Sequence, residues 1–396
     1  MIRIAYVIDH LKMGGAQRHL LQVVRGLDRS RYELEMWTTS AERGELASQF
    51  EEEGVPVRSF EIESTLMSPR TLRACRRVAR DWRARDVHIV HGYLFEGNLL
   101  GTVAGRMARR PVLLVSKRSL DRYQRWDRRA AAWWSNRRAT RVLVNAISVR
   151  NVVLEHEGCS PSQIEHIPNG VPLPDPTVPQ GDSSPEMDPR GDGPLVGMVG
   201  RLGWKKGYEY ALEAFQKVRE RIPDLRVDIV GDGDLRHELP ARAKELGLGD
   251  TVRFLGQQTD VPRRMRRFDC YVLSSVIEGM PNALLEAMAL GRPVVTTSAG
   301  GSAEVATDGE SGMVVPPRDA DALAHAIIRV LTEDLLAQRI SRGGAERVKR
   351  HFSERAMLTA LDKLYRREVA AAGLKAQAAG AEQSSGTSAS ERGVPR

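Results

Sequence analysis

The sequence has few cysteines and no long apolar run. Its 396 residues include three cysteines, Cys75, Cys159 and Cys270, which lie far apart and show no metal-ligand spacing. Scattered thiols of this kind are typical of reduced, cytosolic chains. The apolar run at residues 2–8 is too short for a signal peptide. No stretch approaches the roughly 18 apolar residues of a membrane-spanning helix, so we expect a cytoplasmic protein.

Two familiar motifs are also missing. The formal net charge is +8, which favours an anionic partner. No recognition motif for nucleic acid accompanies this charge, so a nucleic-acid partner is not expected. The glycine pair after the first expected strand lacks the G-x-G-x-x-G spacing of dinucleotide sites, which counts against a dehydrogenase.

Strand and helix patterns alternate regularly through both halves of the chain. The length allows two or three domains with their own cores. The βαβα alternation predicts parallel sheets with helices on both faces, and therefore two Rossmann-like domains. The expected strands are 2–8, 32–38, 87–91, 112–116, 142–145, 195–199, 227–230, 252–255, 271–274 and 294–297, and the expected helices include 16–27, 69–83, 208–221, 235–246 and 283–290.

Composition divides the chain into five parts. The stretch from Pro172 to Pro194 carries seven prolines together with Gly, Ser and Asp, which predicts an exposed linker at 173–194. This linker separates an N-terminal domain, 1–172, from a C-terminal domain, 195–350. An amphipathic helix at 351–369 is a candidate to cross back onto the first domain. The Ala-, Gly-, Ser- and Gln-rich segment 370–396 is predicted to be disordered.

Two carboxylates, Glu278 and Glu286, bracket a glycine loop and the start of a helix. Pro281 suits the first helical position, because its missing N–H would have no intrahelical partner there. The free amides of that first turn, with the positive end of the helix dipole, form an anion site. Asn282 and Glu286 are four residues apart and share one helix face. This arrangement suits a sugar joined through phosphates to a ribose.

Two further loops favour a phosphorylated ligand. Gly14 and Gly15 follow the first expected strand, where glycines let the backbone approach a diphosphate; the pair is equally typical of an ordinary strand-to-helix turn. Arg201 and Lys206 follow the strand at 195–199 and offer a planar fork and a point charge to phosphate oxygens. A solvated basic loop is the alternative, but the carboxyl end of a parallel strand favours ligand binding.

Three other positions have competing interpretations. The run from Gly231 to Asp234 resembles a metal-binding Asp-x-Asp, but its glycines favour a turn after the strand at 227–230. His91 ends a strand and is either a structural histidine or one that faces a ligand cleft. Asn169 and Gly170 are interpreted as a turn that sets the exit of the linker.

With these residues identified, the chain resembles the retaining glycosyltransferases of family 4. The match covers roughly the whole chain up to the tail and is densest at 278–304. There Glu-x7-Glu is followed by Ala-Met-Ala-Leu-Gly-Arg-Pro-Val-Val, then Gly300-Gly301 and Glu304. The resemblance implies the GT-B fold, an α/β architecture of two Rossmann-like domains whose parallel sheets face a central cleft. It also implies a nucleotide-sugar donor held mainly by the second domain and an acceptor on the first.

The resemblance assigns roles to individual positions. Glu278 would contact hydroxyls of the donor sugar and Glu286 the ribose, while Arg201 and Lys206 would hold the diphosphate and stabilise the departing nucleoside diphosphate. His91 would lie near the reacting centre. No metal or other cofactor is implied. The implied catalytic residues are thus His91, Arg201, Lys206 and Glu278, and the implied donor-binding residues are Gly14, Gly15, Gly256, Gln257, Gly279, Met280, Pro281, Asn282, Ala283, Leu284 and Glu286, with Gly256 and Gln257 at the base.

The first half of the chain is rich in arginine, with tryptophans interleaved. Such a surface suits an anionic membrane face, so we expect peripheral attachment to the inner leaflet and a glycan or lipid-linked acceptor of the cell envelope. A solvated, arginine-rich face is the alternative. The residues concerned are Arg70, Arg73, Arg76, Arg77, Arg80, Trp82, Arg106, Arg109, Arg110, Lys117, Arg118, Arg122, Arg125, Trp126, Arg128, Arg129, Trp133, Trp134, Arg137, Arg138 and Arg141.

Two other functions share these motifs. A nucleotide-sugar epimerase of the same fold would need an acid and base pair at the donor sugar, and the match favours transfer instead. A non-catalytic protein that binds a nucleotide sugar would not need the intact set of Glu278, Arg201, Lys206 and Glu286. We therefore expect a retaining transferase that moves a sugar from a nucleotide-diphosphate donor in the synthesis of envelope polysaccharide or glycolipid.

Overall fold

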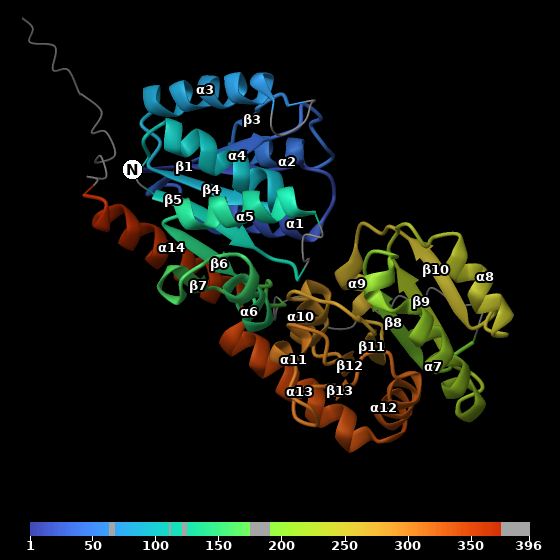
Figure 1. Ribbon diagram of the computed structural model, residues 1–396. Helices are drawn as coiled ribbons and strands as arrows, with labels where there is room; N and C mark the ends of the chain where they lie inside the picture. The colour runs from blue at the N-terminus through green and yellow to red at the C-terminus, as the bar shows by residue number, and fades with distance from the viewer. Residues whose placement is uncertain (63–67, 111, 121–124, 175–190, 374–396) are drawn as a thin grey trace, which may run out of the picture.

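The computed structural model describes residues 1–62, 68–110, 112–120, 125–174 and 191–373 (Figure 1). Within these residues the chain forms two parallel sheets. The first has seven strands in the order β3-β2-β1-β4-β5-β6-β7, and the second has six in the order β10-β9-β8-β11-β12-β13. The expected architecture of two α/β sheets is therefore confirmed. We call the parts built on them the N-terminal unit and the C-terminal unit.

The N-terminal unit contains the expected strands, with ends shifted by up to two residues, and two short ones that the sequence pattern missed. Its strands are β1 (Ile2–Ile8), β2 (Tyr32–Thr38), β3 (Val57–Ser59), β4 (Ile89–Tyr93), β5 (Val112–Lys117), β6 (Arg141–Val144) and β7 (Ile164–His166). Its helices are α1 (Gly15–Gly26), α2 (Ala47–Glu52), α3 (Pro69–Ala84), α4 (Leu94–Met107), α5 (Trp126–Arg138), α6 (Ile147–His156) and the 3₁₀ turn η1 (Pro161–Gln163).

The C-terminal unit repeats the plan and ends in helices. Its strands are β8 (Leu195–Val199), β9 (Arg226–Val230), β10 (Val252–Gly256), β11 (Cys270–Leu273), β12 (Val294–Thr297) and β13 (Met313–Val315). The helices are η2 (Trp204–Lys206), α7 (Tyr208–Arg221), α8 (Glu238–Glu245), α9 (Val261–Met265), α10 (Asn282–Ala289), α11 (Ser302–Val305), α12 (Ala320–Thr332), α13 (Asp334–His351) and α14 (Glu354–Ala371).

Strand β1 shows why these sheets are covered on both faces. Its side chains alternate between two cores: Ile4 and Tyr6 pack with α1 and α14, whereas Ala5 and Val7 pack with α3 and α4. A strand buried on both faces needs a continuous apolar run rather than a polar-apolar alternation. The same logic explains why β3, with an exposed Arg58, escaped the pattern.

The last helix, α14, packs against the N-terminal unit, although it follows the C-terminal one. Its buried residues Leu361, Leu364 and Tyr365 belong to the same apolar core as β1 and α1. Figure 1 shows α14, in red, lying along the N-terminal unit. The domain limits inferred from composition stay predictions, and residues 175–190 of the linker and 374–396 of the tail lie outside the described residues.

The strand order fixes where a ligand site is expected. In the first sheet the chain reverses direction across the sheet between β1 and β4, and in the second between β8 and β11. Loops that leave the carboxyl ends of two such strands diverge and leave room for a ligand. The segments after β8 and β11 are those that carry Arg201, Lys206 and Glu278. Across the described residues, no helix is long and apolar enough to cross a membrane.

Candidate functional site

Lys206 and Glu278 meet at the switch point of the second sheet. The Lys206 Nζ lies 2.6 Å from Glu278 Oε2, and both side chains are partly buried. The Ser275 hydroxyl donates to the same carboxylate oxygen at 3.0 Å. The two loops therefore bring together a cation and a carboxylate that lie 72 residues apart in the sequence.

Close backbone contacts and hydrogen bonds hold these two loops together. Gly207 has φ +60, and a Cβ there would lie 2.3 Å from the Ser274 carbonyl oxygen, so only glycine fits this approach. The Ser274 hydroxyl donates to the Lys206 carbonyl at 2.8 Å, and the Val276 amide donates to the Lys205 carbonyl at 2.8 Å. The position of Lys206 is thus set by the backbone on both sides of it.

Arg201 lies in the same loop but is turned toward solvent. Its side chain is 72% exposed, and its Nη2 lies 3.1 Å from both carboxylate oxygens of Asp234. The Asp-x-Asp run forms a turn, in which Asp232 accepts from the Gly233 amide at 2.8 Å. Within the described residues, no three His, Cys, Asp or Glu side chains gather as a metal site. That the protein needs no metal stays a prediction.

Helix α10 begins at Asn282, one residue after Pro281 and one residue before the expected range 283–290. Pro281 is the cap, with φ −82 and ψ 103, and Asn282 is the first helical residue, so the prediction of Pro281 inside the first turn was wrong by one position. No side chain of the described residues caps this end. The amides of Asn282, Ala283 and Leu284 therefore lack helical acceptors, as an anion site requires; that they bind an anion stays a prediction.

Glu286 lies one turn into α10, and the charge of a residue in the N-terminal unit affects its pKa. Burial raises its pKa above the usual range, and Arg18 of α1 acts in the opposite direction. A carboxylate that is costly to ionise without a partner is a good acceptor for ligand hydroxyls. Its implied contact with a ribose stays a prediction.

The loop at Gly279 is packed directly on the N-terminal unit. A Cβ at Gly279 would lie 2.4 Å from the Arg118 carbonyl oxygen. Cβ atoms at Gly300 and Gly301 would lie 1.9 and 1.8 Å from the carbonyl oxygens of Glu278 and Gly279. Three glycines thus allow the segment 276–282, called the donor loop after its implied role, to lie between its own unit and the end of β5.

The remaining glycine positions lie at the start of α1 and at the end of β10. Gly14 caps α1 and Gly15 is its first residue, and a Cβ at Gly15 would meet nothing within 4 Å. Gly256, at the end of β10, has φ +65, and a Cβ there would lie 2.9 Å from Arg236 Nη1. Gln257 is exposed beside it. Contact of these residues with a diphosphate or a base stays a prediction.

Of the two interpretations of His91, the structure agrees with a structural histidine rather than one that faces a ligand cleft. His91 is fully buried in β4, with Nδ1 2.9 Å from the Tyr365 hydroxyl and Nε2 2.9 Å from the Ser116 hydroxyl. Burial, and secondarily the charge of Arg118, lowers its pKa to about 3. His91 is buried because α14 packs over β4 and places the Tyr365 hydroxyl against its imidazole. A catalytic role for His91 stays a prediction that this placement does not favour.

Three residues that follow strands of the first sheet were given no role in the site by the sequence interpretation. Asp9 directly follows β1; its carboxylate accepts from the Gly97 amide at 2.6 Å, and burial raises its pKa to about 7. A carboxylate directly after a buried central strand was the available signal. Arg118 follows β5, and burial lowers its pKa to about 10. Asn169 is buried between the units, and its Pro-Asn-Gly context indicated only a turn.

The basic, tryptophan-bearing surface is smaller than expected. Trp126 and Trp133 of α5 are 81% and 46% exposed, and Arg137 lies over the Trp133 ring at 5.0 Å. Trp82, in contrast, is buried in the core beneath α3. Lys117 forms a buried ion pair with Glu157 at 2.6 Å, and Arg118 lies inward near the donor loop. Trp82, Lys117 and Arg118 therefore do not belong to this surface, and Arg122 lies outside the described residues.

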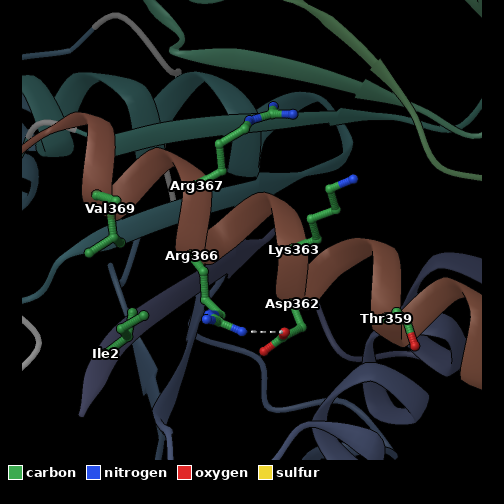
Figure 2. A pocket seen from close by; sticks show the side chains of 8 residues that line it. Ile2, Thr359, Asp362, Lys363, Arg366, Arg367 and Val369 are labelled. Carbon is green, nitrogen blue, oxygen red and sulfur yellow. Dashed lines mark ion pairs between the residues drawn. The ribbon is translucent and has the colours of Figure 1, made fainter.

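A cavity elsewhere in the molecule is unrelated to this site. Figure 2 shows it between α14 and β1, with a volume of about 580 Å³. Ile2, which lines it, begins β1, so the cavity lies at the amino end of the first sheet. Asp362 and Arg366, also on its wall, lie 3.7 Å apart as an ion pair. Ligands of such sheets bind at the opposite, carboxyl end.

The chain has two Rossmann-like units, and the switch point of the second sheet carries a Lys–Glu pair beside an uncapped helix N-terminus. Two such units define the GT-B class of glycosyltransferase folds. Sequence comparison agrees unit by unit. The profile described as Glycosyltransferase Family 4 matches residues 13–174, and the profile described as Glycosyl transferases group 1 matches residues 181–347. The chain belongs to glycosyltransferase family 4.

The chain is also similar to curated bacterial glycosyltransferases. It is 34% identical over 175 residues to the lipopolysaccharide core biosynthesis glycosyltransferase LpsE of Rhizobium meliloti, covering 44% of this chain and 50% of that protein. It is 28% identical over 260 residues to the UDP-Gal:alpha-D-GlcNAc-diphosphoundecaprenol alpha-1,3-galactosyltransferase of Escherichia coli, covering 63% and 67%. The alignment thus spans about half the length of the first relative.

The likeness to solved structures extends over nearly the whole chain. The structure of Anabaena HepE in complex with UDP-glucose matches with a TM-score of 0.79, covering 92% of this chain and 99% of that chain at 22% identity. At this identity the match concerns the fold. It confirms the GT-B architecture.

Proposed function

We propose that this protein transfers a sugar from a nucleotide-diphosphate sugar to a glycan or lipid-linked acceptor with retention of anomeric configuration. The observation that carries the proposal is the Lys206–Glu278 pair, 2.6 Å apart, beside the uncapped start of α10. A cation and free amides suit the diphosphate, and a carboxylate suits sugar hydroxyls. HepE of the same fold binds UDP-glucose, which supports a nucleotide sugar as the ligand.

The chemistry requires charge stabilisation more than an acid and base pair. The bond between the sugar C1 and the diphosphate oxygen breaks, and the leaving diphosphate keeps the electron pair. Lys206 and the α10 amides stabilise that charge, which is the term that lowers such barriers most. The acceptor hydroxyl then attacks C1 from the face that the diphosphate leaves, and its proton passes to a phosphate oxygen. Glu278 and Glu286 bind the substrate rather than act as a glycosidase pair.

Relatives suggest the class of acceptor. The Rhizobium relative is named for lipopolysaccharide core biosynthesis, and the E. coli relative for transfer to a sugar on diphosphoundecaprenol. Both names concern envelope glycans. An envelope acceptor agrees with a cytoplasmic protein that binds the inner leaflet through Trp126 and Trp133 of α5 and the arginines beside them.

Product analysis tests the transfer. The purified protein is incubated with UDP-, GDP- and ADP-sugars, with and without N-acetylglucosamine linked through diphosphate to a short polyprenol. We expect nucleoside diphosphate to be released rapidly only when an acceptor is present, and the new linkage to keep the anomeric configuration of the donor. Isomerised donor without acceptor would indicate an epimerase, binding without turnover a non-catalytic protein, and an inverted product would contradict the mechanism.

Membrane attachment is tested with matched surface variants. The W126A/W133A variant is compared with L335A, which removes an apolar side chain that is 83% exposed on α13 of the other unit. In co-sedimentation with phosphatidylglycerol-containing vesicles at low salt, we expect wild type and L335A to bind and W126A/W133A to stay in solution. If wild type does not bind, the arginine-rich face is simply solvated.

A further inference from the structure

Asn169 links the two units at the donor loop. Its side chain is buried, and its Oδ1 accepts from Arg118 Nη2 at 2.5 Å and from Asn145 Nδ2 at 3.2 Å, both in the N-terminal unit. Its Nδ2 donates to Asn282 Oδ1 at 2.5 Å and to the Met280 carbonyl at 3.4 Å, both in the donor loop. Its backbone amide lies 3.2 Å from the Met280 sulfur.

The partners of Asn169 fix which way its amide points. A guanidinium only donates, so the side of Asn169 that faces Arg118 must be its oxygen. A carbonyl only accepts, so the side that faces Met280 must be its nitrogen. Asn169 therefore donates an N–H to Asn282, and the Asn282 atom that accepts it must be the side-chain oxygen.

This polarity determines what Asn282 offers to a ligand. Its Oδ1 is occupied by Asn169, and its Nδ2 has no hydrogen-bond partner among the described residues. Asn282 is the first residue of α10, where the amides of Ala283 and Leu284 also lack acceptors. Both hydrogens of Nδ2 thus add to a group of donors at the helix start. Donors alone suit phosphate or hydroxyl oxygens.

We propose that Asn169 is a positioning residue for the donor: it holds Asn282 in the orientation that directs the Nδ2 donors to an oxygen of the donor's phosphates or sugar. This inference rests on the proposed function of the donor loop. It adds that the orientation of Asn282 depends on the N-terminal unit, because Arg118 and Asn145 hold the oxygen of Asn169. The donor site would then be complete only when the two units are in contact.

Substitutions that reverse the polarity test the proposal. Asn169→Asp keeps the contact with Arg118 but places an oxygen opposite Met280 and Asn282, so the Asn282 amide turns and shows its oxygen to the donor. Asn282→Asp keeps the bond from Asn169 but replaces the free donors by a carboxylate oxygen. Asn282→Ala removes the group. Binding of the nucleotide sugar that wild type turns over is measured by calorimetry.

We expect N169D and N282A each to weaken donor binding about 10- to 100-fold, as for loss of a hydrogen bond to a charged group. Because Asn169 acts through Asn282, the N169D/N282A double variant should bind no more weakly than N282A. N282D should bind more weakly than N282A. The control is Q216A, which removes a partly buried amide that donates to the Leu246 carbonyl at the end of α8; it should lower Tm without changing donor affinity.

The outcomes separate this inference from the proposed function. If wild type binds no nucleotide sugar, the proposed function fails, and the inference fails with it. If wild type binds but N169D binds equally well, or if the effects of N169D and N282A multiply in the double variant, Asn169 has a merely structural role. Should N169D fail to fold, N282D binding as tightly as N282A overturns the inference on its own.

Discussion

The ammonium of Lys206 and the carboxylate of Glu278 are 2.6 Å apart in a partly buried position at the ends of β8 and β11. Without a donor each group neutralises the other, which avoids leaving a partly buried charge unpaired. A bound diphosphate would pair with the ammonium in place of Glu278, and sugar hydroxyls would donate hydrogen bonds to the carboxylate in place of Lys206. We infer that the pair keeps both groups in place for the proposed ligand.

Replacing Lys206 should reduce turnover more than any neighbouring change. We expect Lys206→Ala to lower kcat about 10²- to 10³-fold, the usual cost of removing one preorganised donor at a developing negative charge. Lys205→Ala is the matched control, because it removes the same group one residue away and should leave kcat within about twofold. Steady-state kinetics with saturating acceptor measures both; equal losses in the two variants would contradict the assignment.

Replacing Glu286 should affect binding rather than stereochemistry. Glu286→Ala removes a largely desolvated carboxylate expected to accept from the ribose, so we expect the Kd for donor to rise about 10-fold or more. The product should keep the donor's anomeric configuration, as measured by proton NMR. Unchanged donor affinity would remove Glu286 from the site.

The burial of His91 has a consequence for pH dependence. Its pKa is about 3 in the fold, whereas an unfolded histidine titrates near 6.5. Between about pH 6.5 and 3 the unfolded state therefore holds one more proton, and stability falls as pH falls. His91→Gln lacks this proton, so its free energy of unfolding should fall by about 1.4 kcal/mol less per pH unit than that of wild type. Equal slopes in urea titrations would mean that His91 ionises in the fold.

Asp9 should change the free energy of unfolding with pH in the opposite direction to His91. Its pKa is raised to about 7 in the fold, against about 3.9 when unfolded, so between these values the folded state holds the extra proton and stability falls as pH rises. In Asp9→Asn this loss disappears, and the free energy of unfolding should rise more steeply with pH than in wild type. A D9N slope equal to or below that of wild type would show that Asp9 is ionised.

The sequence predicted what depends on local pattern and sheet topology. The central strands were found because strands such as β1 are apolar on both faces. The meeting of Lys206 and Glu278 was foreseeable, since carboxyl ends of parallel strands lie at one edge of a sheet. The single-residue error at Pro281 is of the kind expected at helix ends.

What the sequence did not show depends on contacts between distant segments. The position of Tyr365 over His91 arises because α14 returns to the N-terminal unit, which no local pattern specifies. Asn169 lies 113 residues from Asn282 in the sequence, and its Pro-Asn-Gly context indicated only a turn. Trp82 was assigned to the surface because of the arginines around it, yet its own helix position faces the core.

The central claim is that Lys206 and Glu286 mark a site for a nucleotide sugar. The most direct measurement is the Tm of wild type and of the K206A/E286A variant across a panel of nucleoside diphosphates and their sugars. A ligand that binds only the folded state raises Tm with its concentration. We predict a concentration-dependent rise for wild type with one nucleotide family and its sugar, and little or none for the variant. No rise with any member of the panel, or an equal rise in the variant, would contradict the account.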